Sequence, residues 1–238
     1  ELIKEKVISD IERLLNNKQD LTKLKKLKED MMHENYNILC KVFGTPPSHF
    51  DSISLNISKE YSPLEFSNEY IDDILSNYTE VISLSCKEYN KKYKLDFNVP
   101  NLKATQYLNL DLDTIKNLIV RHLKDGRMVW FGCSYRFMSA SLKNKNGILF
   151  NDLYDFRKIG ISKISKNLAE KYDFLNYDHA MLFTGVNIIE DKIKSWKILN
   201  SFGLENNHKG YFVMDNTFFN ENVFMFALHK DYLPQDLI

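Results

Sequence analysis

The chain has 238 residues, of which 44% are hydrophobic, so it is long enough to bury one large core or two smaller ones. Its 32 basic residues balance its 32 acidic ones, which excludes a whole-chain field that attracts nucleic acid or anionic lipid. The three cysteines, Cys40, Cys86 and Cys133, are an odd number at unrelated spacings. This pattern argues against a disulfide framework or a Cys-x-x-Cys metal site and indicates reduced thiols.

Membrane and nucleic-acid partners are not expected. No uninterrupted apolar stretch approaches the length that crosses a bilayer, and the first ten residues lack the basic-then-apolar layout of a secretory signal. The run Lys23–Lys28 is interleaved with leucines at helical spacing, which favours a solvated helix face over a nucleic-acid site. We therefore expect a soluble, cytoplasmic protein.

Helical periodicity runs through the first forty or so residues, where apolar residues such as Ile3, Val7 and Ile11 recur every three or four positions. Gly44 and the two prolines that follow end this segment. The next helix is predicted to start at Ser62, because the serine precedes a proline and has a glutamate three residues later. We expect it to continue to about residue 75.

A further helix is predicted from about Asp113 to Gly126, after which the pattern changes. Short runs rich in β-branched and aromatic residues now alternate with polar turns, and we expect an antiparallel sheet or barrel. The sequence therefore predicts an α+β protein with a mostly helical region, 1–126, and a β-rich region, 127–238, as parts of one packed unit. The predicted strands are Met128–Cys133, Ala180–Val186, Ser195–Asn200, Tyr211–Met214 and Val223–Leu228.

His179 and Asn200 are the candidate chemical pair. His179 precedes the apolar run AMLFTGV, and Asn200 closes a predicted strand about one hairpin later. Antiparallel pairing of the two strands would bring the amide beside the imidazole. In a Cys-His-Asn site, one ring nitrogen takes the thiol proton while the other donates to the asparagine oxygen, which holds the ring in place. An adjacent imidazolium also lowers the pKa of a thiol.

Two segments around this pair resemble a known family. Tyr177–Val186 (YDHAMLFTGV) is similar to the histidine strand of aminopeptidase C and bleomycin hydrolase, and Trp196–Gly203 (WKILNSFG) is similar to their asparagine strand, W-x-x-E-N-S-W-G. Matching segments cover nearly the whole chain. In family order, the others are Phe43–Pro47, Ser62–Phe66, Tyr107–Leu110, Leu123–Gly126, Val129–Cys133, His208–Asp215 and His229–Pro234.

The resemblance implies the C-terminal half of a papain-like cysteine proteinase fold. It implies His179 as general base and acid, Asn200 as the residue that orients it, and Phe202, where the family has tryptophan, as the aromatic shield of their hydrogen bond. The family's nucleophilic cysteine and its oxyanion-hole glutamine lie in an N-terminal helix that this sequence does not contain. Cys133 matches a family cysteine that is not the nucleophile, and we expect a buried structural thiol.

Substrate contacts are implied only by position. The resemblance assigns them to Val129 and Ala180, with Asp178 at the rim, although ordinary strand packing explains Val129 at least as well. The remaining histidines lack a partner at ligand spacing, so neither a metal nor another cofactor is expected. The expected partners are peptide substrates, the Cys-bearing N-terminal half of the same protein and further copies in a homo-oligomer, which is a hexamer in the family.

Two functions remain open from the sequence. The first is the C-terminal part of an intracellular cysteine aminopeptidase that is inactive as this chain alone. The second is a catalytically inactive relative that serves as a peptide-binding or assembly module. Leu199, which stands where the family usually has glutamate, mildly favours the second, as does Phe202.

Overall fold

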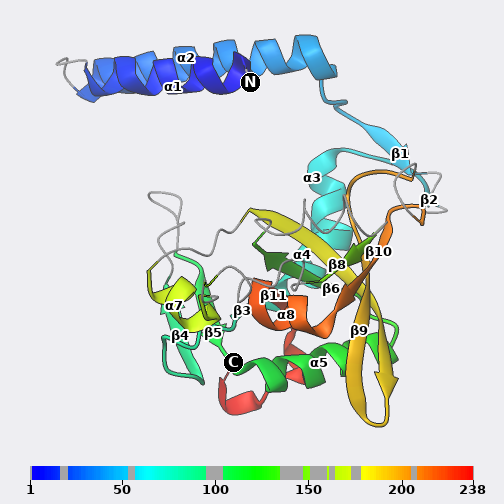
Figure 1. Ribbon diagram of the computed structural model, residues 1–238. Coiled ribbons are helices and arrows are strands. Elements are labelled where there is room, and N and C mark those ends of the chain that lie inside the picture. The colour runs from blue at the N-terminus through cyan, green and yellow to red at the C-terminus, as the bar shows by residue number, and fades with distance from the viewer. Residues whose placement is uncertain are drawn as a thin grey trace. The chain divides into compact units, whose positions relative to one another are not determined.

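The computed structural model describes residues 2–16, 21–52, 57–94, 104–134, 147–150, 160, 164–172, 178–204 and 208–237 (Figure 1). The chain divides into two compact units, Glu1–Asp72 and Asp73–Ile238. Within the described residues, no helix has both the length and the apolar character that a membrane crossing requires.

The first unit begins with two helices, α1 (Leu2–Leu15) and α2 (Leu21–Phe43), as the apolar periodicity predicted. They lie side by side, and Lys6 joins them because its Nζ lies 2.9 Å from Asp10 Oδ2 on α1 and 3.1 Å from Glu34 Oε2 on α2. Met31 of α2 is buried. Several large apolar side chains of the two helices are nevertheless exposed: Ile8, Ile11, Leu15, Met32, Tyr36, Val42 and Phe43.

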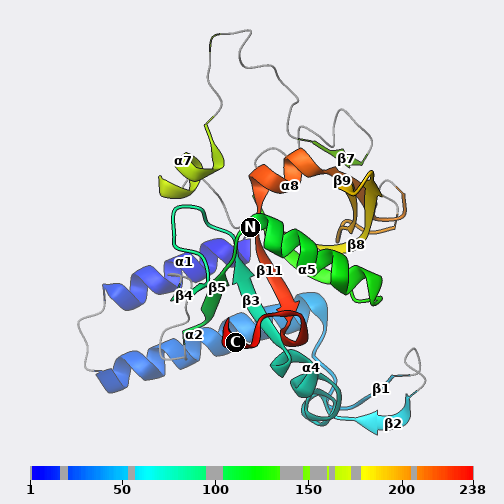
Figure 2. The ribbon, with the colours of Figure 1, turned by 90° about the horizontal axis from the view of Figure 1, so that it is seen from below.

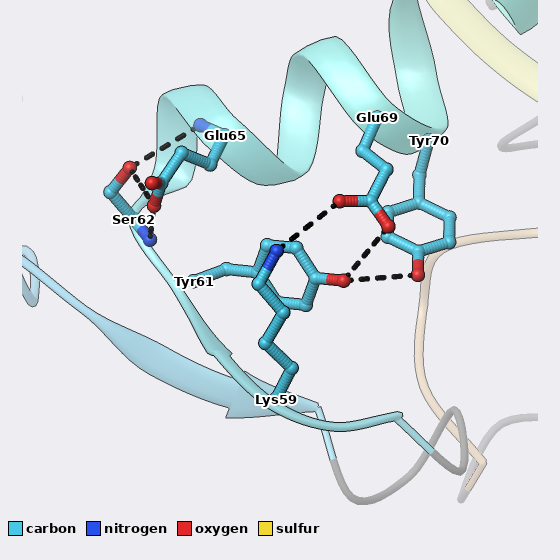
Figure 3. Close-up of polar contacts among 6 residues, drawn as sticks. All are labelled: Lys59, Tyr61, Ser62, Glu65, Glu69 and Tyr70. Atoms are coloured by element: carbon cyan, nitrogen blue, oxygen red, sulfur yellow. Dashed lines mark hydrogen bonds and ion pairs between the residues drawn. The ribbon is translucent and has the colours of Figure 1, made fainter.

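The predicted helix start at Ser62 is confirmed. The Ser62 hydroxyl accepts the Glu65 backbone N–H at 3.3 Å, and the Glu65 carboxylate accepts the Ser62 backbone N–H at 2.9 Å, which is a complete capping box (Figure 3). The helix is interrupted by one π-helical turn, a feature that re-aims the side chains it contains. The elements here are β1 (Phe50–Ser52), β2 (Ile57–Tyr61), α3 (Pro63–Phe66), the π turn (Ser67–Ile71) and α4 (Asp72–Ser76).

Tyr61 connects β2 to this helix. Its hydroxyl donates to Glu69 Oε1 at 2.9 Å and lies 3.2 Å from the Tyr70 hydroxyl, so both helical partners come from the π turn (Figure 3). The hydrogen bond with Tyr70 raises the pKa of Tyr61. Lys59 completes the cluster with its Nζ 4.4 Å from the centre of the Tyr61 ring and 3.6 Å from Glu69.

The described residues of the second unit form a nine-stranded sheet in the order β4-β5-β3-β11-β6-β8-β9-β10-β7. Most neighbours are antiparallel, but β3 pairs with β5, and β10 with β7, in parallel. The strands are β3 (Tyr78–Ile82), β4 (Lys91–Lys94), β5 (Gln106–Asn109), β6 (Val129–Cys133), β7 (Ile148–Leu149), β8 (His179–Ile189), β9 (Lys192–Leu199), β10 (Tyr211–Asp215) and β11 (Val223–His229).

Helices α5 (Leu112–Lys124) and α8 (Asn216–Asn222) lie beside each other against the sheet (Figures 1 and 2). The Lys116 ammonium of α5 lies 5.7 Å from the centre of the Phe219 ring of α8, and this contact links the two helices. Shorter helices complete the unit: α7 (Lys166–Lys171) and two 3₁₀ turns, Lys230–Tyr232 and Gln235–Leu237.

A chain of aromatic rings forms the centre of the core under these helices. Phe131 of β6 stacks on Phe183 of β8 with ring centres 4.0 Å apart, and Trp196 of β9 lies 5.1 Å from Phe183. Phe219 stacks on Trp196 at 4.9 Å. Each ring is almost fully buried, and burial of one such side chain contributes about 1.5–3 kcal/mol. The core thus fixes how β6, β8 and β9 lie against one another.

The structure divides the chain at a different place from the sequence prediction. The predicted boundary was Gly126, whereas the compact units meet at Asp72 and Asp73. Strands β3, β4 and β5, and helix α5, all precede Gly126 and belong to the sheet or its core. These strands have four or five residues each, and β4 reads Lys-Lys-Tyr-Lys because it is an edge strand. Such short segments carry little periodic signal.

Asn109 organises the loop after β3. It is fully buried at the end of β5, and its Oδ1 accepts the Leu84 backbone N–H at 2.9 Å. Its Nδ2 donates to the carbonyl oxygens of Leu84, Lys87 and Glu88 at 3.0–3.2 Å. One side chain therefore satisfies four backbone groups of the loop between β3 and β4.

Replacement of Asn109 by alanine is expected to lower the free energy of unfolding by about 2–4 kcal/mol, because it leaves buried backbone groups without partners. Urea denaturation followed by tryptophan fluorescence measures the change. Asn187→Ala, at an exposed position of β8, is the matched control and is expected to have little effect. Equal stability of the two variants would contradict the role of Asn109.

Candidate active site

The strand register brings His179 and Asn200 together at the start of β8 and the end of β9. His179 is the first residue of β8 and pairs with Cys133 of β6. Leu199, the last residue of β9, pairs with Leu182 of β8, so the next position places Asn200 opposite Met181. Asn200 is therefore a diagonal neighbour of His179 on one face of the sheet. The sequence predicted this juxtaposition.

His179 and Asn200 are joined by a hydrogen bond. The His179 Nε2 atom lies 3.1 Å from Asn200 Oδ1, which also accepts the Ser201 backbone N–H at 2.8 Å. Because that oxygen can only accept, the ring nitrogen that faces it carries the proton. The bond selects the Nε2–H tautomer of a neutral ring and leaves Nδ1 as the basic nitrogen. Asn200 is 5% exposed, so water has little access to the bond.

Phe202 lies next to the pair. Its ring centre is 5.5 Å from that of His179, and on its other side it contacts Phe212 with ring centres 6.5 Å apart. This is the position expected of an aromatic shield. The Phe202 side chain is still 38% exposed, so it covers the histidine in part.

Gly210 holds the loop of Asn200 against β10. Its backbone has a φ of 84°, and a Cβ atom there would lie 3.3 Å from the Gly203 carbonyl oxygen and 3.5 Å from that of Asn200. The Gly210 carbonyl accepts the Asn200 backbone N–H at 2.9 Å. A side chain at this position would therefore strain the backbone and displace the asparagine.

A pocket of about 240 Å³ opens beside His179. Two of the predicted substrate contacts, Asp178 and Ala180, are exposed and line it. The rest of its wall comes from residues that the sequence prediction missed. They are Trp130 and Gly132 of β6 and Met225 of β11.

Val129, the other predicted substrate contact, does not line this pocket. It is fully buried, pairs with Phe183 and belongs to the core. Alternation along β6 explains the difference, because Trp130 and Gly132 point to the face opposite that of Val129. Gly132, which pairs with Ala180, is the residue of β6 nearest the histidine on the pocket face. Packing is the role that the structure assigns to Val129.

The three cysteines do not supply a reactive thiol to His179. Cys133 lies opposite His179 in the strand register, but its side chain is fully buried. Burial, together with the negative charge of Asp178, raises the pKa of its thiol to about 12. Cys86 is exposed and Cys40 is half-buried on α2. The expected structural role of Cys133 fits this environment.

His122 illustrates a histidine with a structural role. It is fully buried on α5, its Nδ1 donates to the Leu118 carbonyl at 2.7 Å and its Nε2 accepts the His229 backbone N–H at 3.0 Å. Burial lowers its pKa, so the ring is neutral. Among the described residues, no three His, Cys, Asp or Glu side chains come close enough together to hold a metal ion.

Iodoacetamide at pH 8 is expected to alkylate Cys86 well before Cys133 in the folded protein. A thiol with a pKa of about 12 has roughly one part in ten thousand as thiolate at that pH, and burial also denies access to the reagent. Peptide mass spectrometry over a time course measures the two rates. Rapid labelling of Cys133 without unfolding would show that its thiol is activated.

The tautomer of His179 can be observed directly. Long-range ¹H–¹⁵N correlation at pH 8 is expected to show Nε2 protonated and Nδ1 unprotonated in the unmodified protein. Asn200→Ala removes the acceptor, so we expect the ring signals to shift toward a mixture of tautomers. The signals lost in His33→Ala belong to an exposed histidine of α2 and serve as the reference. An Nδ1–H ring in the unmodified protein would refute the hydrogen bond.

Comparison with known proteins extends these observations. The sequence profile of the Peptidase C1-like family matches residues 2–238. Aminopeptidase C of Listeria innocua is 33% identical over 224 residues, which are 89% of this chain and 50% of that protein. Aminopeptidase C of Lactobacillus helveticus is 31% identical over 240 residues, 96% of this chain and 53% of that protein. The chain thus spans about half the length of these curated relatives.

A solved structure shares the fold. The crystal structure of PepW from Lactobacillus rhamnosis HN001 has a TM-score of 0.81 and 29% identity, and the match covers 99% of this chain and 56% of that one. The similarity therefore includes both compact units.

Proposed function

The chain belongs to the Peptidase C1-like family, and from this premise we propose that it is the His- and Asn-bearing part of a papain-like cysteine aminopeptidase. Its fold is that of the papain-like proteinases, of the α+β class. The hydrogen bond between His179 Nε2 and Asn200 Oδ1 is the observation that carries the proposal. It holds the His179 ring in the tautomer and orientation that general acid–base catalysis by a thiol peptidase requires.

In the proposed mechanism, the thiol comes from outside this chain. His179 Nδ1 takes the proton of that thiol, and the thiolate attacks the carbonyl carbon of the scissile peptide bond. The imidazolium then gives its proton to the leaving amine, which leaves an acyl group on sulfur. Water releases the acyl group with His179 as the base, and the thiol is restored. Donors to the oxyanion would also come from the Cys-bearing segment.

Asn200 and Phe202 would hold the His179 ring in one orientation through these steps. Because the asparagine oxygen accepts from Nε2–H in both the neutral and the charged ring, the same bond serves before and after proton transfer. It fixes the ring plane, so Nδ1 keeps its direction. Phe202, 5.5 Å from the ring centre, limits the water that competes for the bond.

We extend the proposal to the partners: peptide substrates, the Cys-bearing N-terminal half of the protein and other copies in a homo-oligomer. The open pocket beside His179 supports the first two, because it leaves the start of β8 accessible to a peptide and to a thiol. The exposed apolar side chains of α1 and α2 support the third. Such side chains are typical of surfaces that another protein covers.

An inactive peptide-binding module is the second candidate. It is favoured by Phe202, a smaller ring than the family tryptophan, which covers His179 only in part. Leu199, where the family usually has glutamate, also favours the inactive module. In this candidate the pocket beside His179 would still hold a peptide, but no thiol would reach the histidine. Hydrolysis of a peptide-like substrate distinguishes the two functions, because only the peptidase catalyses it.

The test uses the full-length protein that the proposal requires, in which a Cys-bearing segment accompanies this chain. It is expected to hydrolyse an aminoacyl-coumarin amide under reducing conditions. His179→Ala should lower the rate by about 10²–10⁴-fold, since it removes the general base and acid. Asn200→Ala should cause a smaller loss, and His33→Ala, on α2, should cause none. Absence of turnover in the unmodified protein would favour the binding module.

A further inference from the structure

A second pocket, of about 410 Å³, opens on strands β8, β9 and β10. The described residues of its wall include one lysine, Lys197, and one histidine, His208, but neither aspartate nor glutamate. We propose that this pocket binds a small carboxylate that carries an apolar body, with Lys197 as the receptor for the carboxylate group. The inference does not depend on the peptidase function, because it concerns a different pocket from the one beside His179.

Cross-strand pairing places Lys197 on the outer face of the sheet, away from the core. Lys197 of β9 pairs with Gly185 of β8 on one side and with Val213 of β10 on the other. Its chain neighbours, Trp196 and Ile198, are buried in the core. Because successive side chains of a strand point to opposite faces, the lysine points outward. Lys197 is accordingly exposed, and a ligand can reach it from solvent.

Gly185 leaves room for a ligand beside Lys197. A Cβ atom at the glycine would lie 3.3 Å from the Cβ of Lys197 and 3.8 Å from its Cδ. The missing side chain therefore leaves a hollow next to the lysine stem. Val213, on the other side of the lysine, lines the pocket and is 40% exposed. An apolar body in the hollow would remove this valine surface from water, which is favourable.

Tyr211 holds the positive charge of Lys197 in the wall of the pocket. The Lys197 Nζ lies 4.3 Å from the centre of the Tyr211 ring, which is within the range of cation–π attraction. Because Lys197 pairs with Val213, the tyrosine two residues earlier is its diagonal neighbour on the same face. An aromatic face carries no net charge, so the ammonium group keeps its attraction for an anion. The contact thus positions the charge without neutralising it.

Neutral hydrogen-bond donors in the wall also suit a carboxylate. Asn187 and Ser195 form the cross-strand pair next to that of Lys197, and both line the pocket. A carboxylate has several lone-pair sites, so it can accept from an amide and a hydroxyl while it pairs with an ammonium group. Asp215, which pairs with Ser195, is not part of the wall. Its carboxylate instead caps α8, where it accepts the Phe218 backbone N–H at 2.7 Å.

Two probes of equal shape and different charge test the proposal. They are 3-phenylpropionate, whose carboxylate is ionised at neutral pH, and 3-phenylpropionamide, which is neutral. Isothermal titration calorimetry on the full-length protein that contains this chain measures the affinity of each. We expect the carboxylate to bind with at least about threefold higher affinity than the amide, as an exposed charge pair provides.

Three variants locate the binding. Lys197→Met is expected to abolish the preference for the carboxylate, because it removes the charge and keeps a long side chain. Lys194→Met is the matched control, since Lys194 is also an exposed lysine of β9 but is on the opposite face of the strand. It should keep the preference. Gly185→Ala should weaken the binding of both probes at least about twofold, because the added methyl group crowds the hollow.

A preference for the carboxylate that disappears in Lys197→Met alone, together with weaker binding in Gly185→Ala, would support the inference. Equal affinity for the two probes, or no binding of either, would overturn it. A preference that persists in Lys197→Met, or that Lys194→Met removes equally, would also overturn it, as would unchanged binding in Gly185→Ala.

Discussion

The antiparallel register of β8 and β9 is the constraint on which the candidate site depends. Side chains alternate along a strand, so a shift of one residue would move Asn200 to the face opposite His179. The core prevents that shift, because Met181 and Phe183 of β8 must be buried together with Trp196 and Ile198 of β9. The hydrogen bond at the ends of β8 and β9 is thus a consequence of aromatic packing in the middle of these strands.

The same packing explains why the Cys133 thiol is buried while the histidine beside it lines an open pocket. Cys133 and His179 occupy paired positions, but the cysteine is in the closed core, whereas the histidine lines the pocket. Burial favours the neutral thiol, and the negative charge of Asp178 acts in the same direction. His179, by contrast, is held by the Asn200 amide oxygen and lines the open pocket.

Asp178 links the pocket to the core. It lines the pocket beside His179, and its negative charge contributes to the raised pKa of the buried Cys133 thiol. The residue adjoins His179 in the chain, and β6 and β11 provide the remaining wall of the pocket.

Local patterns were enough to predict much of this protein. The capping box at Ser62 and the strands from Val129 to His229 depend on neighbours in sequence, and the His179 and Asn200 motifs identified the pair. Only the tertiary structure decided that strands before Gly126 join the same sheet, and that Gly132 lines the pocket where Val129 was expected. The physical reason is that pairing between distant strands sets sheet order, register and the face that each side chain takes. A sequence pattern records the alternation of side chains, but not which face of the sheet the core will cover.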